Sequence, residues 1–396
     1  MNRLLLILIL IFLFLLGMSK NPPKKERDMG ANLSSLNRFT FNLYKEILKN
    51  NLGENIFFSG TSIYLAMGMV YEGSRGKTLK EMEKVLFIDT SDTKRELKIK
   101  FLMEEISKEK ENKFHIANAL WLQKDFQILK DYLKKIEEYY KGKAEKLNFK
   151  ENPEGCRKII NSWIEENTSK RIKDLIPEGT LGPSIRMVLT NAIYFKGNWL
   201  KKFDEKETRE EDFKIDDQKR AKVKMMRALE EEFNYGENEN FQVLELPYSG
   251  ENLSMILILP KKGDLNLDYE TFEELRQSLN KMKVDVYIPR FSFEKKYFLN
   301  DAFKNMGMVE VFTDSADLSG ISGKKNLKVD DIIHQAFVQV DEEGTEAAGA
   351  TAVTVRVTSV SGKRIPVFRA DHPFLFCIYH RKTEVILFLG NFSKPM

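Results

Sequence analysis

Residues that could carry out hydrolysis are few in this chain, and their spacing fits no common catalytic motif. Neither a His-Glu-x-x-His metal site nor a Gly-x-Ser-x-Gly nucleophile turn occurs in the sequence. Ser59, Ser62 and His334 could be arranged as a catalytic triad, but a buried, hydrogen-bonded histidine explains His334 more simply. The chain contains four histidines: His115, His334, His372 and His380. These residues therefore give little support to hydrolase chemistry, and we predict no catalytic residues among them.

A glycine-containing segment looks like the end of a phosphate-binding loop. Residues 73–78 read Gly-Ser-Arg-Gly-Lys-Thr, but the loop requires a glycine five residues before the second one, and that position is Tyr71. We predict instead the start of a helix with Lys77 facing solvent. The two cysteines, Cys156 and Cys377, are too few for a disulfide scaffold or for a zinc site made of cysteines alone. We expect buried free thiols, and no metal or other cofactor.

The charge balance argues against a nucleic-acid partner. The 396 residues include 63 lysines and arginines against 59 aspartates and glutamates, which gives a net charge of +4. Nucleic-acid binders carry a strong and uneven positive charge instead. Lysines between Lys94 and Lys113 are interleaved with glutamates, so this stretch is predicted to be a solvated helix face and not a polyanion site. The hydrophobic share of 42% excludes a disordered chain.

The N-terminal residues have the features of a secretory signal. Arg3 precedes an unbroken apolar run over residues 4–16, and Gly17 and Ser19 give the small-x-small pattern of a cleavage site. An uncleaved anchor is the alternative, although the run is short for a membrane span of about 20 residues. We expect a secreted protein with no membrane contact after cleavage. Three parts are predicted: a signal peptide at 1–19, a flexible lead-in at 20–30 and a single domain at 31–396.

Helical and strand-like patterns are interleaved along the rest of the chain, which predicts an α+β protein. Apolar residues at helical spacing form two groups: Leu36, Phe39, Leu43 and Ile47, capped by Ser34 or Ser35, and Ile159, Ile160, Trp163 and Ile164. Two predicted strands, 255–259 and 284–288, are each followed by a proline. Two more, 374–378 and 385–389, are separated by a polar turn and predict a buried hairpin.

Residues 334–360 have a pattern that an ordinary core strand does not need. The first part alternates, with Ala336, Val338 and Val340 on one face. A turn is expected at residues 342–344. From Thr345 the alternation resumes for about 14 residues, and one face is small or apolar throughout while charges occur only on the other.

Two explanations fit this pattern. One is a long permanent hairpin, with the second strand antiparallel to the first. The other is a segment that waits as a loop and later inserts as a strand, because the small residues 347–350 could thread between two existing strands. A flat β-prone edge of this length would promote aggregation if it stayed exposed. The small residues favour the second explanation.

At this segment the sequence resembles the inhibitory hinge of the serpin family, the serine protease inhibitors. The similar stretch is Glu342-Glu343-Gly344-Thr345-Glu346-Ala347-Ala348-Gly349-Ala350-Thr351-Ala352. Three further motifs occur in the order found in the family, and the resemblance extends from about residue 31 to residue 396. They are Asn55 to Ser62, Leu189 to Trp199, and His372 to Phe376. One departure is Gly60, where the family usually has proline.

The resemblance implies the serpin fold, with three β-sheets, eight or nine helices and an exposed reactive-centre loop. It also implies that the protein is not an enzyme but a monomeric suicide inhibitor whose partner is a serine endopeptidase. The protease serine forms an acyl-enzyme with the loop, the cleaved loop inserts into the main sheet as an added strand, and hydrolysis stalls. Two alternatives stay open: a non-inhibitory carrier or chaperone, and an inhibitor of a cysteine protease.

The resemblance also implies roles for individual residues. Gly344 and Thr345 would begin the insertion, and the hinge as a whole covers residues 342–351. The polar cluster beneath the point where the sheet opens would contain Ser59, Ser62, Asn191 and His334. The region where the loop first enters would contain Trp199, Arg290 and Glu342, and Arg290 could pair with Glu342.

The spacing found in the family implies a reactive bond 14 residues after Gly344, between Thr358 and Ser359. A small β-branched residue before the bond suits an elastase-like or subtilisin-like protease. A shorter register would place the bond between Arg356 and Val357, and would favour a trypsin-like protease.

Overall fold

The computed structural model describes residues 33–91, 94–109, 111–262, 265–345 and 365–395. The predicted signal peptide and lead-in lie outside these ranges, as do the two candidate reactive bonds. Within the described ranges, no helix is both long enough and apolar enough to cross a membrane.

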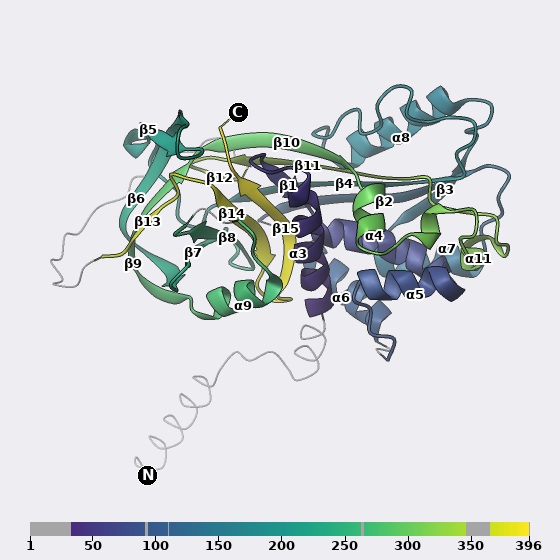
Figure 1. The fold of residues 1–396 in the computed structure, drawn as a ribbon, viewed down its shortest axis with the longest axis horizontal. Coiled ribbons are helices and arrows are strands. Elements are labelled where there is room, and N and C mark those ends of the chain that lie inside the picture. Colours follow the sequence, from purple (N-terminus) through teal and green to yellow (C-terminus); the bar gives the residue numbers. More distant parts are fainter. Residues whose placement is uncertain (1–32, 92–93, 110, 263–264, 346–364, 396) are drawn as a thin grey trace, which may run out of the picture.

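Two hydrogen-bonded sheets form the body of the protein (Figure 1). The six-stranded sheet contains, in order, β10 (Phe291–Phe298), β11 (Asp331–Val340), β12 (Gly344–Thr345), β4 (Met187–Asn198), β2 (Lys113–Gln123) and β3 (Lys143–Leu147). The nine-stranded sheet contains, in order, β1 (Ile56–Phe58), β15 (Val385–Phe392), β14 (Phe374–His380), β8 (Leu253–Pro260), β7 (Phe241–Pro247), β6 (Arg220–Glu237), β9 (Asn280–Pro289) and β13 (Val367–Arg369), with β5 (Arg209–Lys214) paired to β6.

A bulge divides the nine-stranded sheet into two parts. The register between β6 and β9 shifts between Ala228 and Glu231 of β6. β5 pairs with β6 before the bulge, and β7 pairs with β6 after it. β6 and β9 run through both parts, so the two parts are hydrogen-bonded into one sheet. The described residues therefore form two hydrogen-bonded sheets, where the resemblance implied three.

Nine α-helices occur in the described residues, in agreement with the expected eight or nine. They are α3 (Ser34–Lys49), α4 (Gly60–Gly73), α5 (Gly76–Val85), α6 (Arg95–Ser107), α7 (Lys130–Lys135), α8 (Pro153–Asn167), α9 (Tyr269–Gln277), α10 (Asn300–Asn305) and α11 (Ser319–Ser322). A π-helical turn, η1 (Ile136–Tyr140), continues α7, and short 3₁₀ turns are η2 (Glu205–Glu207) and η3 (Glu310–Phe312). Figure 1 shows α8 on one face of the six-stranded sheet and α4 to α7 on the other.

Most predicted elements are present. The predicted strands lie in β8 and β9, and the C-terminal pair forms the antiparallel hairpin of β14 and β15. α3 buries its apolar stripe, but the capping prediction is wrong, because Leu33 occupies the N-cap position and no side chain caps the helix. In α8, Ile160 and Ile164 are buried while Ile159 is 50% exposed, since adjacent helical residues point about 100° apart.

The predictions for the glycine-containing segment at 73–78 and for the lysine-rich stretch between Lys94 and Lys113 have different outcomes. α5 begins at Gly76, and Lys77 is exposed and pairs with Glu310, which confirms the predicted helix start. The prediction of a solvated face for the lysine-rich stretch is partly wrong, because Lys98 and Glu105 of α6 are buried. Lys382, in the turn of the C-terminal hairpin, lies 2.9 Å from the Glu105 carboxylate and helps to cover it. Both cysteines are buried free thiols, as expected.

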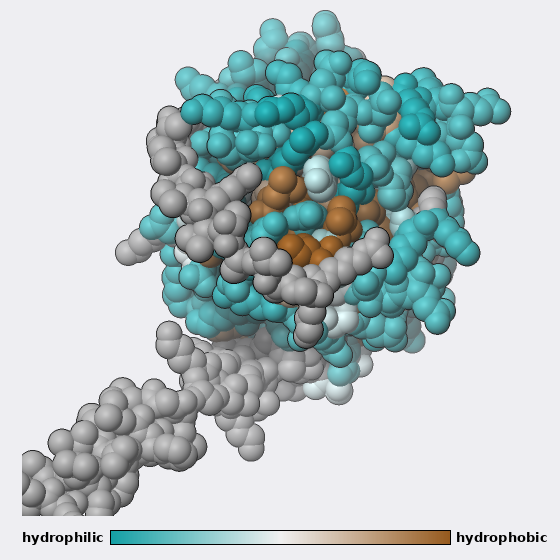
Figure 2. All heavy atoms as spheres, turned by 90° about the vertical axis from the view of Figure 1, so that its left-hand side faces the viewer, coloured by the Kyte–Doolittle hydropathy of each residue, from teal (hydrophilic) through white to brown (hydrophobic). Residues whose placement is uncertain are grey.

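The end of the molecule formed by β5, β6, β9 and β13 is mostly hydrophilic, with a small apolar area near its centre (Figure 2). Opposite charges pair across β5 and β6, where Asp212 lies 2.8 Å from Lys222. A second pair joins Lys214 to Asp217 at 2.8 Å. Such pairing agrees with the mixed surface expected from the near-neutral charge.

Phenylalanine rings join the two sheets. Phe57 of β1 stacks on Phe388 of β15, with ring centroids 5.1 Å apart, and on Phe376 of β14 at 5.7 Å. The same ring meets the edge of Phe293 at 6.4 Å. Because Phe293 belongs to β10 of the six-stranded sheet, Phe57 connects the cores of both sheets.

We predict that Phe57→Ala lowers the free energy of unfolding by about 3–5 kcal/mol, because losing a buried aromatic ring removes contacts and leaves a cavity. The melting temperature at one fixed scan rate measures the loss. Phe298→Ala is the control, since Phe298 also lies on β10 but is 51% exposed, and its effect should stay within about 0.5 kcal/mol. Equal shifts for the two variants would contradict the bridging role of Phe57.

Candidate functional site at the open end of the six-stranded sheet

The six-stranded sheet changes its pairing partway along its central strands. β4 and β11 pair directly, in parallel, over six residues of each strand. Further along, β12 lies between them, and Thr345 pairs with both Gly197 of β4 and Val340 of β11. The sheet is therefore open at this end by the width of one strand, and Gly344 and Thr345 occupy the opening. We call this region the open end.

The turn that leads into β12 depends on an aspartate and a glycine. The Asp341 side chain accepts hydrogen bonds from the backbone N–H groups of Glu343 and Gly344, at 3.0 and 3.2 Å. A Cβ atom at position 344 would lie 2.1 Å from the carbonyl oxygen of Gly197, so only glycine allows this close approach to β4. The turn predicted at residues 342–344 is confirmed.

Trp199, which follows β4, forms two hydrogen bonds with the turn. Its backbone N–H donates to the carbonyl of Glu343 at 2.9 Å, and its indole N–H donates to the carbonyl of Asp341 at 2.9 Å. The N–H of Phe203 donates to the carbonyl of Glu342 at 3.0 Å. Three successive carbonyl groups thus have partners, which fixes the backbone that enters β12.

The Glu342 carboxylate is buried beside polar partners. Its side chain is 3% exposed and lies 3.5 Å from the guanidinium of Arg290. It also accepts a hydrogen bond from the hydroxyl of Thr208 at 2.8 Å. A buried carboxylate needs such partners, because desolvation otherwise disfavours its charged form. The structure thus brings together Trp199, Arg290 and Glu342, the residues expected where the loop enters.

A buried polar cluster lies where β4 and β11 pair directly. The His334 ring donates from Nδ1 to the Asn191 side-chain oxygen, and its Nε2 accepts from the backbone N–H of Ser59 at 3.1 Å. The Ser62 hydroxyl donates to the side-chain oxygen of Asn118 at 3.1 Å and accepts from the Asn191 amide at 2.5 Å. All four residues expected in this cluster come together, and Asn118 joins them. The cluster links both strands to the start of α4.

This cluster is not a catalytic triad. The Ser59 hydroxyl donates to the carbonyl of Leu387 at 2.6 Å and accepts from the N–H of Ser62. Neither serine hydroxyl of the cluster is therefore bonded to the His334 ring, whereas a nucleophile needs an adjacent base. In the described ranges, no group of three or more His, Cys, Asp or Glu side chains could hold a metal ion. The cluster can hold strands together, and it has no arrangement for hydrolysis.

The site also contains residues that were not predicted, among them Asn118 and Tyr248. Asn118 lies between two alanines in the middle of β2. A lone polar residue in an apolar strand was the one sequence feature that could have marked it as part of the site. Tyr248 follows β7, and its hydroxyl lies 2.7 Å from the hydroxyl of Thr345. No local pattern marks Tyr248, because its partner is 97 residues away in the chain.

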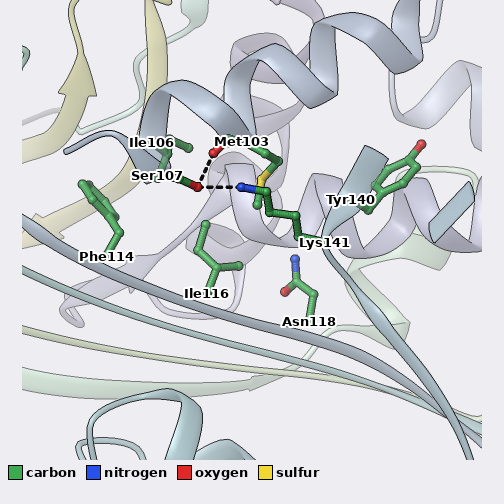
Figure 3. A pocket seen from close by; sticks show the side chains of 8 residues that line it. All are labelled: Met103, Ile106, Ser107, Phe114, Ile116, Asn118, Tyr140 and Lys141. Atoms are coloured by element: carbon green, nitrogen blue, oxygen red, sulfur yellow. Dashed lines mark hydrogen bonds between the residues drawn. The ribbon is translucent and has the colours of Figure 1, made fainter. Parts of the chain in front are cut away.

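Asn118 also lines a cavity of about 160 Å³ between α6, η1 and β2 (Figure 3). Figure 3 shows the Lys141 ammonium donating to the Ser107 hydroxyl, which in turn donates to the carbonyl of Met103, at 2.8 and 2.6 Å. The other walls are largely apolar and include Ile106, Phe114 and Ile116. The cavity is small and holds no pair of acid and base, so it offers no hydrolytic chemistry.

The remaining predicted site residues lie outside the described ranges. They are the rest of the hinge, Glu346, Ala347, Ala348, Gly349, Ala350 and Thr351, and the two candidate reactive bonds, Thr358–Ser359 and Arg356–Val357.

Comparison with known proteins agrees with this geometry. The family model described as "Serpin (serine protease inhibitor)" matches residues 34–395. The chain belongs to the serpin family. An uncharacterized serpin-like protein of Thermococcus kodakarensis is 41% identical over 371 residues, which cover 92% of this chain and 85% of that protein. The leukocyte elastase inhibitor of Xenopus laevis is 39% identical over 383 residues, which cover 92% of this chain and 100% of that serpin.

Solved serpin structures share the fold. Uncleaved ovalbumin is 32% identical, with a TM-score of 0.82 over 91% of this chain and 99% of the ovalbumin chain. Human thyroxine-binding globulin is 29% identical, with a TM-score of 0.84 over 93% of this chain and 99% of the globulin chain. The serpin fold is thereby confirmed.

We predict that His334 makes stability fall at low pH. Burial lowers the pKa of His334 to about 3 and outweighs its hydrogen bond to Asn191, whereas a histidine in the unfolded chain titrates near 6.5. Between these values the unfolded state binds a proton that the folded state excludes, so stability decreases as pH falls. His334→Gln should lower the melting temperature at pH 7 and flatten its decline between pH 7 and pH 4.

His372→Gln is the matched control. Burial lowers the pKa of His372, but its bonds to Asp371 and to the Pro260 carbonyl raise the pKa overall. A raised pKa stabilises the fold at low pH, and this contribution is lost as pH rises. Removing His372 should therefore steepen the acid decline. If His334→Gln keeps the native slope, a neutral buried His334 is ruled out.

Proposed function

We propose that this serpin is a secreted, monomeric inhibitor of serine endopeptidases, and that it traps its target by inserting the cleaved reactive loop at the open end. The observation that carries the proposal is β12, because Gly344 and Thr345 already occupy a strand position between β4 and β11. In the proposed insertion these two residues would be the first part of the added strand. The relatives support protease inhibition, since one of them is named leukocyte elastase inhibitor.

The trapping reaction starts as ordinary proteolysis. The protease serine oxygen bonds to the carbonyl carbon of Thr358, the bond to the nitrogen of Ser359 breaks, and Ser359 leaves with a proton as a new amino terminus. Residues after Thr345 then continue β12 between β4 and β11. Burial of Val353, Val355 and Val357 would contribute on the order of 5–9 kcal/mol, as an upper bound. Insertion is therefore driven by burial of the apolar face of the loop, before water can release the protease.

The residue before the bond sets the target class. Thr358 is small and β-branched, so we propose an elastase-like or subtilisin-like protease. Cleavage after Arg356 would instead select a trypsin-like protease. No cofactor and no polyanion is part of the proposed mechanism, and the predicted signal at 1–19 supports secretion.

The second candidate function is carriage of a ligand. Thyroxine-binding globulin has the same fold and its structure was solved with its ligand, so a non-inhibitory role is compatible with the architecture. The hinge favours inhibition, because residues 345–351 are all small apart from Glu346. Bulky residues there would hinder threading between β4 and β11. Inhibition of a cysteine protease uses the same insertion and is a further outcome of the test below.

We predict that incubation with elastase, subtilisin or trypsin gives a covalent complex that survives denaturing electrophoresis. The acyl bond survives because the loop inserts faster than water hydrolyses the acyl-enzyme. Sequencing the released C-terminal peptide identifies the bond, with Ser359 as the expected new amino terminus. A papain-type protease tests the cysteine-protease alternative. If every protease cleaves the protein and none forms a complex, the inhibitor proposal is wrong and the non-inhibitory, ligand-carrying role is favoured.

Thr345→Arg should abolish most of the complex, because an arginine side chain at a position that is 1% exposed cannot be buried without a large desolvation cost. We expect at least a tenfold loss of complex, with cleaved inhibitor in its place. Thr90→Arg is the control, since Thr90 is exposed and lies before α6. Unchanged complex yield for Thr345→Arg would show that insertion at the hinge is not the working step.

A further inference from the structure

Tyr248 connects the nine-stranded sheet to the hinge. It directly follows β7, forms an isolated bridge with Trp199, and donates its backbone N–H to the carbonyl of Leu253 at 2.9 Å. Its ring stacks on Trp199 at 4.6 Å and meets Phe195 edge-on at 5.1 Å. The side chain is fully buried. These contacts hold the ring from several sides, so the position of the hydroxyl is well determined.

Gly197 of β4 leaves the space that this ring needs. A Cβ atom at position 197 would lie 2.9 Å from a ring carbon of Tyr248. Gly197 is also the residue that pairs with Thr345 across β4 and β12. The ring of Tyr248 therefore lies directly against the backbone that receives the hinge.

The two hydroxyl groups depend on each other. Tyr248 and Thr345 are 0% and 1% exposed, and their oxygens are 2.7 Å apart. Among the described residues, neither hydroxyl has another hydrogen-bond partner. Burial raises the pKa of Tyr248, so the phenol keeps its proton and can donate. Loss of either group would leave the other buried without a partner, which is costly, whereas loss of both would be nearly neutral.

We propose that Tyr248 is a positioning residue for the inhibitory reaction: its hydroxyl holds Thr345 in the opening between β4 and β11 before any protease attacks. The inference rests on the proposed trapping function. Both strands that flank β12 belong to the six-stranded sheet, whereas Tyr248 directly follows β7 of the nine-stranded sheet. The bond therefore fixes the depth of the hinge in the core independently of the backbone ladder. With the first residue already in place, insertion competes better with deacylation.

A double-mutant cycle tests this role. Tyr248→Phe and Thr345→Val each remove one hydroxyl with little change of shape, and each should shift the hinge about tenfold toward the expelled state. The combined variant should lie closer to the native protein than either single variant. Thr345→Ser keeps the hydroxyl and should behave as the native protein does. Tyr235→Phe is the matched control, because Tyr235 is 3% exposed and its hydroxyl bonds to Gln242, away from β12.

Two readouts separate this inference from the proposed function. Hydrogen exchange of the peptide that contains Gly344 and Thr345 needs no protease, and it should be about tenfold faster in each single variant. The moles of inhibitor consumed per mole of protease trapped should rise in the same variants and not in Tyr235→Phe. Melting temperatures check that each variant folds. If Tyr248→Phe does not fold, the comparison of Thr345→Val with Thr345→Ser still tests whether the hydrogen bond holds the hinge.

The outcomes are distinct. Unchanged exchange in the single variants, or a double variant whose effect is the sum of the two, would overturn the role of Tyr248. If the native protein forms no complex with any protease, the proposed function fails, and the exchange data still decide whether Tyr248 holds the hinge. Changed exchange with unchanged trapping would also overturn the inference, because the bond would then hold the hinge without serving inhibition.

Discussion

The backbone groups of β4 and β11 must be hydrogen-bonded along their whole buried length, yet the two strands pair directly over only part of it. Where they separate, their inner N–H and C=O groups face a gap one strand wide, and unpaired buried groups are costly. β12 meets this requirement with two residues, Gly344 and Thr345. The turn at Asp341, the bonds from Trp199 and the ring of Tyr248 all serve to place those two residues. The same gap gives a longer strand a place to enter.

The buried polar cluster limits how far this opening extends. Asn191 and His334 face each other on β4 and β11, at a point where those strands are directly paired. A fully satisfied polar network stabilises one arrangement, but any separation leaves several buried groups without partners. The cluster is also tied to α4 through Ser59 and Ser62. Opening the sheet past this point therefore requires the strands and the helix to exchange hydrogen bonds together.

The serpin fold alone does not determine what a member of the family does. Uncleaved ovalbumin and thyroxine-binding globulin match most of this chain with TM-scores of 0.82 and 0.84, and the family model that matches it is described as that of serine protease inhibitors. The feature that favours inhibition over another role lies in the residues that would enter the opening between β4 and β11. In the proposed insertion, the small residues 347–350 would follow Thr345 into the opening, and their size is a property of the hinge sequence and not of the sheets around it.

Local patterns were sufficient for much of the fold. Alternation in 336–340 predicted β11, and an apolar run at 255–259 followed by a proline predicted β8, because each of these strands has neighbours that bury its apolar residues. The turn at 342–344 followed from its glycine. The capping of α3 and the exposed Ile159 were mispredicted, because a cap depends on backbone geometry and a helical face on what packs against it. Resemblance to a family supplied four residues of the polar cluster and the pairing of Arg290 with Glu342.

The sequence by itself determined that a tract of small residues, 347–350, follows the turn at Gly344 and that neither a His-Glu-x-x-His nor a Gly-x-Ser-x-Gly motif is present. Only the tertiary structure decided that Thr345 already lies between β4 and β11, that Asn118 joins the cluster, and that the hydroxyl of Tyr248 is hydrogen-bonded to that of Thr345. The contact between Tyr248 and Thr345, for example, joins residues 97 positions apart in the chain. Side-chain periodicity reports which face of an element is buried, but it carries no information about which distant atom completes a hydrogen bond there.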